Sequence, residues 1–456
     1  MTAVKQYILV ATMTAMLLVI ATGCDSSATD DHAETIAPVS DGGGDIPGTT
    51  TAPSGDQTAW DQRQVEAYRI ELVEVAFEAA TKIPVQPHIK TRSREQNKTV
   101  ALCLELGLPQ QALRYIEQVD NWQRGVGYAD LAFYLVRHGY ADDVQPYLDK
   151  AALIAETPST DWRRDRIRAK IARTYAWLGQ MDRAAAFEAG VEDSESGQVA
   201  RVNAMRCTDE QLDAQMDAFD QIIAAGTFDS TRNVLAAYAL LFDRFYDNAE
   251  RRNVVEEKLK KSWAGMPLAI RISFVLTLAD TALDHDDQTK ALAFVNDAQT
   301  IIDSIDAAVQ TEDTEDEGDG DDAGQVAGMR WPLRHRIPMV ARVAAMRARA
   351  GDGERARHDV DALLSLYEKH RERIANIDRA EALRSVAEAY RALGDAAAAL
   401  AVYKRAVEAG VANPNSRPRA EDLGGTCRSM ALHAAKPDAE LWSRIREING
   451  ALGTPW

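Results

Sequence analysis

The chain has 456 residues, a formal net charge of −18 at pH 7 and four cysteines. A hydrophobic fraction of 46% excludes a wholly disordered chain, and four cysteines are too few for a disulfide scaffold. The negative charge is concentrated in residues 25–60 and 311–324, which carry seven and eight acids and no lysine or arginine. The rest of the chain is nearly neutral and lacks the basic balance of a nucleic-acid-binding protein, so nucleic acid is not an expected partner.

Residues 1–24 have the layout of a secretory signal. Lys5 is the only charge, an apolar stretch follows over residues 7–21, and small residues precede Cys24. The stretch is short for a transmembrane helix. The ending Ala21-Thr22-Gly23-Cys24 resembles the bacterial lipobox, although alanine stands at position 21, where leucine is usual. This resemblance implies cleavage before Cys24 and lipidation of its sulfur, which would anchor the protein to a membrane of the bacterial cell envelope, facing the periplasm or the exterior. The alternatives are a plain signal peptide and a cytoplasmic protein with an apolar N-terminal helix.

Residues 25–60 are rich in Asp, Ser, Thr, Gly and Pro and have few large apolar side chains. Such a segment cannot bury enough apolar surface to offset the entropy lost on ordering. We therefore expect an acidic disordered tether with a root-mean-square length of about 30–36 Å. One lipid-modified end and one folded body at the other end would be the simplest arrangement.

From residue 61 onward the chain is rich in alanine, and apolar residues recur at intervals of three and four, which predicts helices almost throughout. The first predicted helix covers residues 61–82. A unit of helix, turn at Gly or Asp, and second helix then recurs, with its clearest copy at residues 380–414. Six earlier copies, one of them weak, have small residues at the same places, and the anchors of the second helices are Ala112, Val144, Ala184, Ala249, Ala291, Ala356 and Ala399.

This pattern resembles the tetratricopeptide repeat, in which small residues at helix crossings allow close packing. The anchors are spaced by 32, 40, 65, 42, 65 and 43 residues, whereas the family period is about 34, so each gap of 65 could contain a degenerate repeat or an insertion. The predicted fold is all-α, an α-solenoid of stacked antiparallel helix pairs, with arrays of the HEAT kind or an irregular superhelix as alternatives. We predict an N-terminal array over residues 61–310, an acidic flexible insertion over 311–329 and a C-terminal array over 330–456, in which Trp442 and Trp456 cover the end of the stack.

Motifs for catalysis are missing from the sequence. It contains no Gly-rich phosphate loop, G-x-S-x-G, H-E-x-x-H or C-x-x-C. Residues 313–318 resemble the start of a calcium loop, but Gly324 occupies the position of the bidentate glutamate. Cys103, Cys207 and Cys427 are expected to be small buried apolar residues. We therefore predict no catalytic residue, no cofactor and no metal.

In tetratricopeptide proteins the first helix of each repeat lines the binding groove. The resemblance therefore implies a protein-binding groove lined by residues at the matching positions of this chain. These candidates are Arg166, Arg173, Trp177, Asp280, Asp284, Arg349, Glu381, Arg384, Glu388 and Arg391. Mixed charges and one aromatic side chain suit a protein or peptide partner.

The sequence thus predicts a membrane-anchored lipoprotein that acts as a scaffold or adaptor and not as an enzyme. The first alternative is an envelope enzyme, or its non-catalytic subunit, with a site that no local motif reveals. The second is a structural spacer of the envelope. A further hypothesis is that the acidic segment 311–324 contacts the eight arginines within residues 330–357.

Overall fold

The computed structural model describes residue 60 and residues 63–158, 160–312 and 331–456. The predicted signal peptide, Cys24, nearly all of the predicted tether, and the acidic insertion with its calcium-like motif lie outside these residues. None of the described helices is long and apolar enough to cross a membrane.

The described residues form nineteen α-helices and no strand, which confirms the predicted all-α fold. The helices are α2 (Ala67–Lys82), α3 (Val85–Glu105), α4 (Pro109–Ile116), α5 (Gln123–Arg137), α6 (Gln145–Ala155), α7 (Asp161–Trp177), α8 (Met181–Glu188), α9 (Gln198–Arg206), α10 (Asp209–Ala225), α11 (Phe228–Arg244), α12 (Ala249–Ser262), α13 (Leu268–Asp284), α14 (Gln288–Glu312), α15 (Leu333–Arg349), α16 (Gly353–His370), α17 (Asn376–Ala392), α18 (Ala396–Val411), α19 (Ser416–Leu432) and α20 (Ala439–Gly450). Three short 3₁₀ helices, η1 (Ala141–Asp143), η2 (Trp263–Gly265) and η3 (Arg371–Arg373), lie between them.

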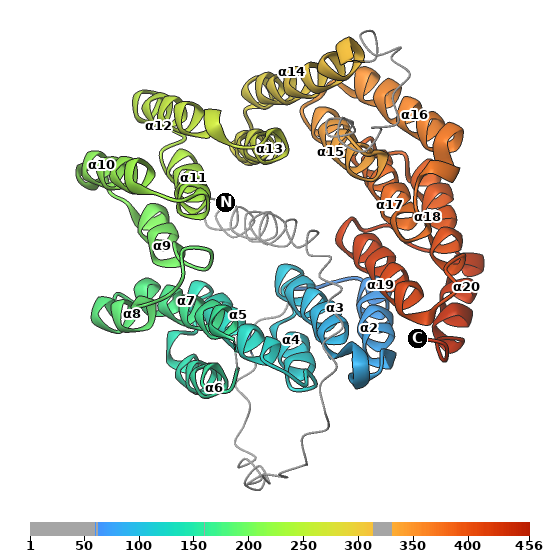
Figure 1. Ribbon diagram of the computed structural model, residues 1–456, viewed down its shortest axis with the longest axis horizontal. Coiled ribbons are helices and arrows are strands. Elements are labelled where there is room, and N and C mark those ends of the chain that lie inside the picture. The colour runs from blue at the N-terminus through green and yellow to red at the C-terminus, as the bar shows by residue number, and fades with distance from the viewer. Residues whose placement is uncertain (1–59, 61–62, 159, 313–330) are drawn as a thin grey trace, which may run out of the picture.

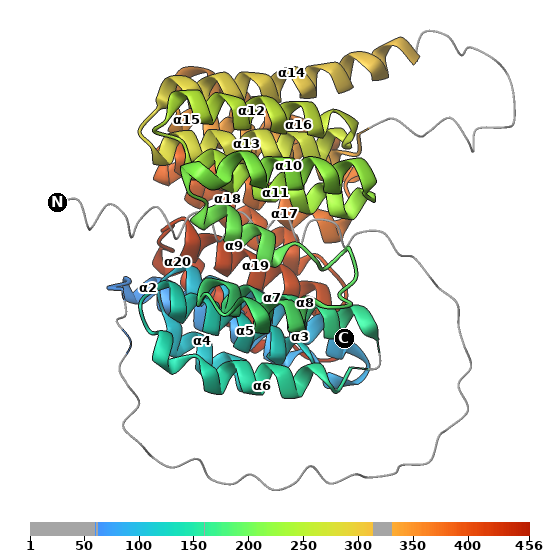
Figure 2. The same cartoon turned by 90° about the vertical axis from the view of Figure 1, so that its left-hand side faces the viewer.

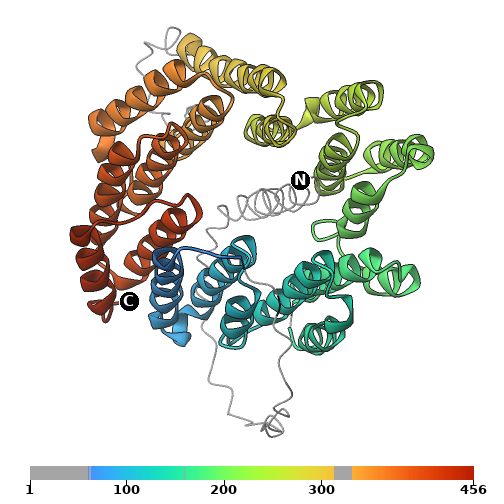
Figure 3. The ribbon, with the colours of Figure 1, turned by 180° about the vertical axis from the view of Figure 1, so that it is seen from behind.

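From α3 onward the helices are paired in two layers. Each odd-numbered helix from α3 to α19 packs against the next odd-numbered helix, and these helices form the inner layer of the ribbon (Figure 1). The even-numbered helices from α4 to α20 lie outside them, as the view from behind also shows (Figure 3). Seen from the side, most helices run across the picture, so they lie roughly along the axis about which the layers curve (Figure 2).

The curved stack closes on itself. Helix α2, the first described helix, packs along α19 and against α3, so the two ends of the chain lie side by side (Figure 1). The sequence predicted tryptophans as the cover of a free end, and this expectation was wrong in one respect. Trp442 packs as a partly buried side chain, but each end of the stack is covered by the other. We call the contact of α2 and α3 with α19 and α20 the seam.

The predicted turns at Gly or Asp are confirmed, and they share one hydrogen-bonding pattern. The residue at the turn has a left-handed backbone at Gly107, Gly139, Gly179, Asp286, Gly351 and Gly394, and Ala434 takes the same place after α19. In each copy the next residue donates its N–H to the carbonyl five residues earlier, as Gln180 does to Tyr175 over 2.9 Å. This is the Schellman motif, which satisfies the last carbonyls of a helix and lets the chain reverse. Among the described helices of the inner layer, α9 and α11 end without this left-handed turn.

The small anchors explain the pairing. Ala112, Ala184, Ala291, Ala356 and Ala399 are fully buried, and Val144 is 2% exposed. Ala249 of the weak copy is instead exposed, because it is the first residue of α12. The first gap of 65 residues contains an additional pair, α9 and α10, and the second contains the long helix α14 and the residues outside the described part.

The buried apolar residues form two clusters. One joins α2–α9 to α15–α20 across the seam, and the other joins α9–α14 to a few residues of α15. The predicted division into arrays at residues 311–329 stays a prediction. Cys103, Cys207 and Cys427 are buried and free, as expected, and burial raises the pKa of Cys103 and brings that of Cys427 to about 12.

Candidate interaction surface on the inner helices

All ten residues predicted to line a groove lie on inner helices. Helix α7 carries Arg166, Arg173 and Trp177, α13 carries Asp280 and Asp284, α15 carries Arg349, and α17 carries Glu381, Arg384, Glu388 and Arg391. The structure gathers them in three separate groups, and most of their polar atoms bind a neighbouring helix. Their first role in the described part of the chain is therefore to join repeats.

The group on α7 is held by α5. Lys170 and Arg173 donate to the same oxygen of Asp130, over 2.7 and 2.8 Å. The guanidinium of Arg173 also lies 4.0 Å from the ring centroid of Phe133. Burial raises the pKa of the Asp130 carboxyl, but the charges of Lys170 and Arg173 lower it further, so the net pKa falls below its ordinary value.

Aromatic rings and guanidinium groups alternate at the C-terminal ends of α5, α7 and α9. Phe133 and Trp177 meet edge to face with centroids 5.8 Å apart, and Arg137 lies 5.6 and 5.5 Å from their centroids. Arg206, the last residue of α9, lies 5.8 Å from the ring of Trp177 and donates to the carbonyl of Trp177. Three successive inner helices are therefore joined at one edge of the ring by contacts between arginine and aromatic side chains.

Cations outnumber acids in this region, which we call the cationic arc and define as Arg137, Lys170, Arg173, Arg201 and Arg206 with Asp130. Burial, together with the positive charge of Arg173, lowers the pKa of Arg137 and of Arg201 to about 10. Arg232 acts on Arg201 in the same direction, whereas Asp243 of α11 partly offsets the effect on Arg137. Mutual repulsion of this kind is relieved by a bound anion.

Arg166 lies at the other end of α7. It binds the carboxylate of Glu195 with two nitrogens, over 2.6–3.0 Å, and its guanidinium lies near the rings of Trp122 and Trp162. A bidentate pair of this kind fixes the residues that precede α9 to α7. Arg166 is therefore already occupied by a carboxylate of its own chain.

The second group is acidic and lies between α13 and α15. Arg349 is bonded to Asp280, and Arg342 lies where both Asp280 and Glu388 favour its charge. Burial, assisted by the negative charges of Asp280 and Asp243, raises the pKa of Asp284 to about 7. Next to it, His285 bonds to Asp243 over 3.1 Å, and this carboxylate raises the pKa of His285 against the effect of burial.

The third group joins α17 to α19. Arg391 donates to the carbonyls of His433 and Ala434, which end α19, over 3.1 and 3.2 Å. Glu388 accepts from Ser429 over 2.6 Å, and Arg384 lies 3.5 Å from the carboxylate of Asp422. Glu381 is exposed. Burial raises the pKa of Asp422 to about 7 despite Arg384.

Sequence reasoning missed the residues of α5 and α9 that complete the cationic arc. A signal for part of them was present, because Asp130 and Lys170 each stand nine residues before a turn glycine, and Arg137 and Trp177 each stand two before it. Arg201 and Arg206 had no such marker, because α9 ends without a left-handed glycine.

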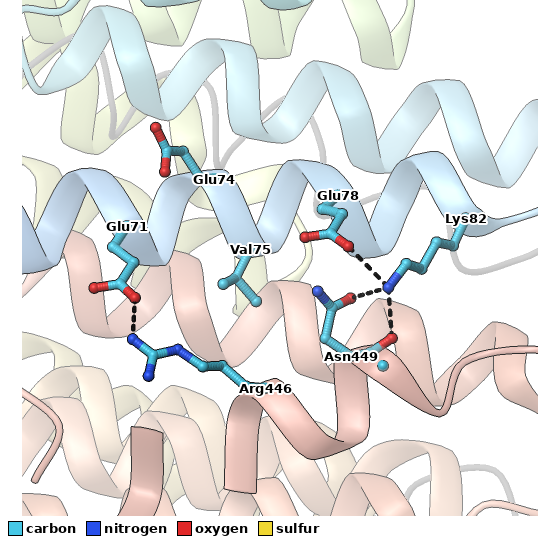
Figure 4. Close-up of a pocket in the computed structure, with 8 residues that line it drawn as sticks. Glu71, Glu74, Val75, Glu78, Lys82, Arg446 and Asn449 are labelled. Atoms are coloured by element: carbon cyan, nitrogen blue, oxygen red, sulfur yellow. Dashed lines mark hydrogen bonds and ion pairs between the residues drawn. The ribbon is translucent and has the colours of Figure 1, made fainter. Parts of the chain in front are cut away.

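The seam contains a polar cavity of about 350 Å³ between α2 and α20 (Figure 4). It is lined by Glu71, Glu74, Val75, Glu78, Lys82, Arg446, Asn449 and Gly450. The ammonium of Lys82 bonds to the backbone oxygen of Asn449 over 2.7 Å and to Glu78 over 2.9 Å, and Arg446 pairs with Glu71. These contacts join the two ends of the chain, and two of the three carboxylates that line the cavity already face cations.

No cluster of three or more His, Cys, Asp or Glu side chains in the described part of the chain is placed to hold a metal ion. No protein-family model matches the sequence, and no curated protein matches it.

Proposed function

We propose that this protein is a lipid-anchored, extracytoplasmic scaffold that holds a protein or peptide partner at the inner layer of its helix pairs. Cys24 would carry the anchor, and residues 25–60 would act as the tether. The observation that supports this function best is the cationic arc, where guanidinium groups and aromatic rings of α5, α7 and α9 meet at one edge.

The chemistry of the arc suits a polypeptide that carries carboxylates. Guanidinium groups form charge-assisted hydrogen bonds with carboxylates, and Phe133 and Trp177 offer apolar area beside them. Asp130 already takes up part of the charge of Lys170 and Arg173, which leaves Arg137, Arg201 and Arg206 as the cations with the most to gain. A partner would therefore bind across three repeats and not within one.

The test is crosslinking in living cells, followed by capture from the membrane fraction. Native protein is compared with Cys24→Ala, with Arg206→Glu, and with Arg355→Glu as a matched reversal of an exposed arginine on the outer helix α16. We expect one stoichiometric envelope protein to be captured with native protein and Arg355→Glu, and several-fold less with Arg206→Glu. Cys24→Ala should leave the membrane fraction and lose the partner.

Two results would overturn this function. If Arg206→Glu captures as much partner as Arg355→Glu, the arc is not the binding surface. If the captured species is a small molecule or an enzyme active only with this chain, the protein is a subunit of an envelope enzyme.

A further inference from the structure

The chain enters the folded body next to the cationic arc. Trp60 is 7% exposed, and its indole N–H donates to Asp143 of η1 over 2.9 Å. The backbone N–H of Arg63 donates to the carbonyl of Gly107 over 3.2 Å, and the charge of Arg63 acts on His138, the residue that follows Arg137. Residues 60 and 63 therefore lie at the same end of α5 as the arginine and aromatic contacts.

The residues before Trp60 carry the opposite charge. Residues 25–59 contain seven acids and no lysine or arginine. These acids are Asp25, Asp30, Asp31, Glu34, Asp41, Asp45 and Asp56. The arc has five cations and a single acid, and Arg206 is exposed while Arg137, Lys170, Arg173 and Arg201 are partly accessible.

The distance is short enough for the two to meet. A flexible chain of fifteen residues, from Asp45 to Trp60, spans about 19–23 Å on average. Short tethers give effective concentrations in the millimolar range, so weak contacts of carboxylates with guanidinium groups suffice for substantial occupancy. Contacts of this kind are weakened by salt, because the Debye length falls to about 3 Å at 1 M.

We propose that the acidic segment 25–56 is an intramolecular ligand of the cationic arc, so that a partner must displace it to bind. Its carboxylates take the place that an acidic partner would take, beside Phe133 and Trp177. The inference rests on the proposed use of the arc as a binding surface, and it adds that the tether controls access to that surface.

The experiment uses the full-length chain with Cys24→Ser, purified in detergent, and a photo-crosslinking amino acid at Ser40. Crosslinked residues are located by mass spectrometry at low and high salt. We expect crosslinks to concentrate on residues 133–137, 173–177 and 201–206. Their yield should fall at least five-fold at 1 M salt, and by a similar factor when all seven acids are changed to Asn or Gln. Those changes lie outside the described body, so its folding is not disturbed.

Arg206→Glu should reduce the crosslinks, and Arg355→Glu should leave them unchanged. An even spread of crosslinks over the body, or an unchanged yield after neutralisation of the acids, would overturn the proposal. Crosslinks between two copies that increase with protein concentration would also overturn it in favour of a second chain as the occupant.

The same variants separate this proposal from the proposed function. Neutralising the acids should increase the capture of the envelope partner if the segment competes for the arc. If capture depends on Arg206 but Ser40 does not crosslink to the arc, the function stands and the intramolecular contact does not.

Discussion

The seam between α3 and α19 and the junction between α5 and α7 are built with the same chemistry, although they differ greatly in sequence separation. At α5–α7, Asp130 is 15% exposed and binds two cations of the next helix, Lys170 and Arg173. At the seam, Glu95 is 3% exposed and binds one cation of the other helix, Arg428, over 2.6 Å. Lys98 and Arg94, on the same helix as Glu95, complete its surroundings.

The difference shows how closing the stack depends on single residues. The partners at α5–α7 are 40 and 43 positions apart, and the partners at the seam are 333 apart. A buried carboxylate loses its hydration and needs cations nearby, and the seam has one such cation from across the contact where α5–α7 has two. The seam should therefore be more sensitive to the loss of one arginine.

The largest effect is expected from Arg428→Ala. It leaves Glu95 buried with cations of its own helix only, and we expect the free energy of unfolding to fall by about 3 kcal/mol. Arg173→Ala at α5–α7 should cost about half as much, because Lys170 still reaches Asp130. Urea titration measures both, and equal losses would show that the two junctions do not differ.

The pH dependence of this loss follows from Glu95. Its pKa is lowered to about 2, because Arg428 and Lys98 outweigh the effect of burial. A lowered carboxyl pKa contributes stability that is present above the ordinary value near 4.5 and lost as the pH falls toward 2. The difference between native protein and Arg428→Ala should therefore shrink between pH 6 and pH 3.

A smaller effect of opposite sign is expected at the α13–α15 junction, where acids outnumber cations. The pKa of Asp284 is raised to about 7, so between pH 4 and pH 7 the folded state keeps a proton that the unfolded state has lost. This group therefore makes the protein less stable as the pH rises through that interval. Asp284→Asn should be more stable than native protein by about 1–2 kcal/mol at pH 8 and equal to it at pH 4.

The control at this junction is Asp280→Asn, which removes the partner of Arg349. It should destabilise the protein at pH 8, where Asp284→Asn stabilises it. Thermal unfolding at both pH values distinguishes the two, and a stabilising Asp280→Asn would contradict the assignment of the raised pKa to Asp284.

The turns allow a third comparison between the seam side and the interior. Gly179 after α7 has φ +76°, and a Cβ added there would have no neighbouring atom within 4 Å, so Gly179→Ala should cost about 1 kcal/mol from backbone strain alone. Gly107 after α3 has the same φ, but a Cβ there would lie 2.7 Å from Cγ of Arg63. Gly107→Ala should therefore cost more in chemical denaturation, and equal costs would show that Arg63 moves aside freely.

The smallest effect is expected from Arg446→Ala. Arg446 is 61% exposed and pairs with Glu71 at the rim of the seam. Exposed ion pairs contribute at most about 1 kcal/mol, and salt screens them. The loss should be below about 1 kcal/mol and should vanish at 1 M salt, whereas a loss as large as that of Arg428→Ala would place the strength of the seam at its rim.

Part of the candidate surface could be predicted from the sequence. The family pattern placed Arg173, Trp177 and seven further candidates, together with Arg166, on inner helices, because their position relative to the turn fixes the face they occupy. It gave no hint that Arg384, Arg391 and Glu388 bind α19 and that Arg349 binds Asp280. Which charges face one another depends on the rotation of neighbouring helices, and no local pattern contains this information.

The sequence by itself determined the helices, their pairing and their turns. Small residues at crossings and a left-handed Gly or Asp at each turn act within about forty residues, so a single unit contains all the information needed to form it. Only the tertiary structure decided that the stack curves until α2 meets α19, and that the arginines of α5, α7 and α9 gather at one edge. Curvature is the sum of small rotations at many junctions, and a contact between Glu95 and Arg428 exists only after all of them have been made.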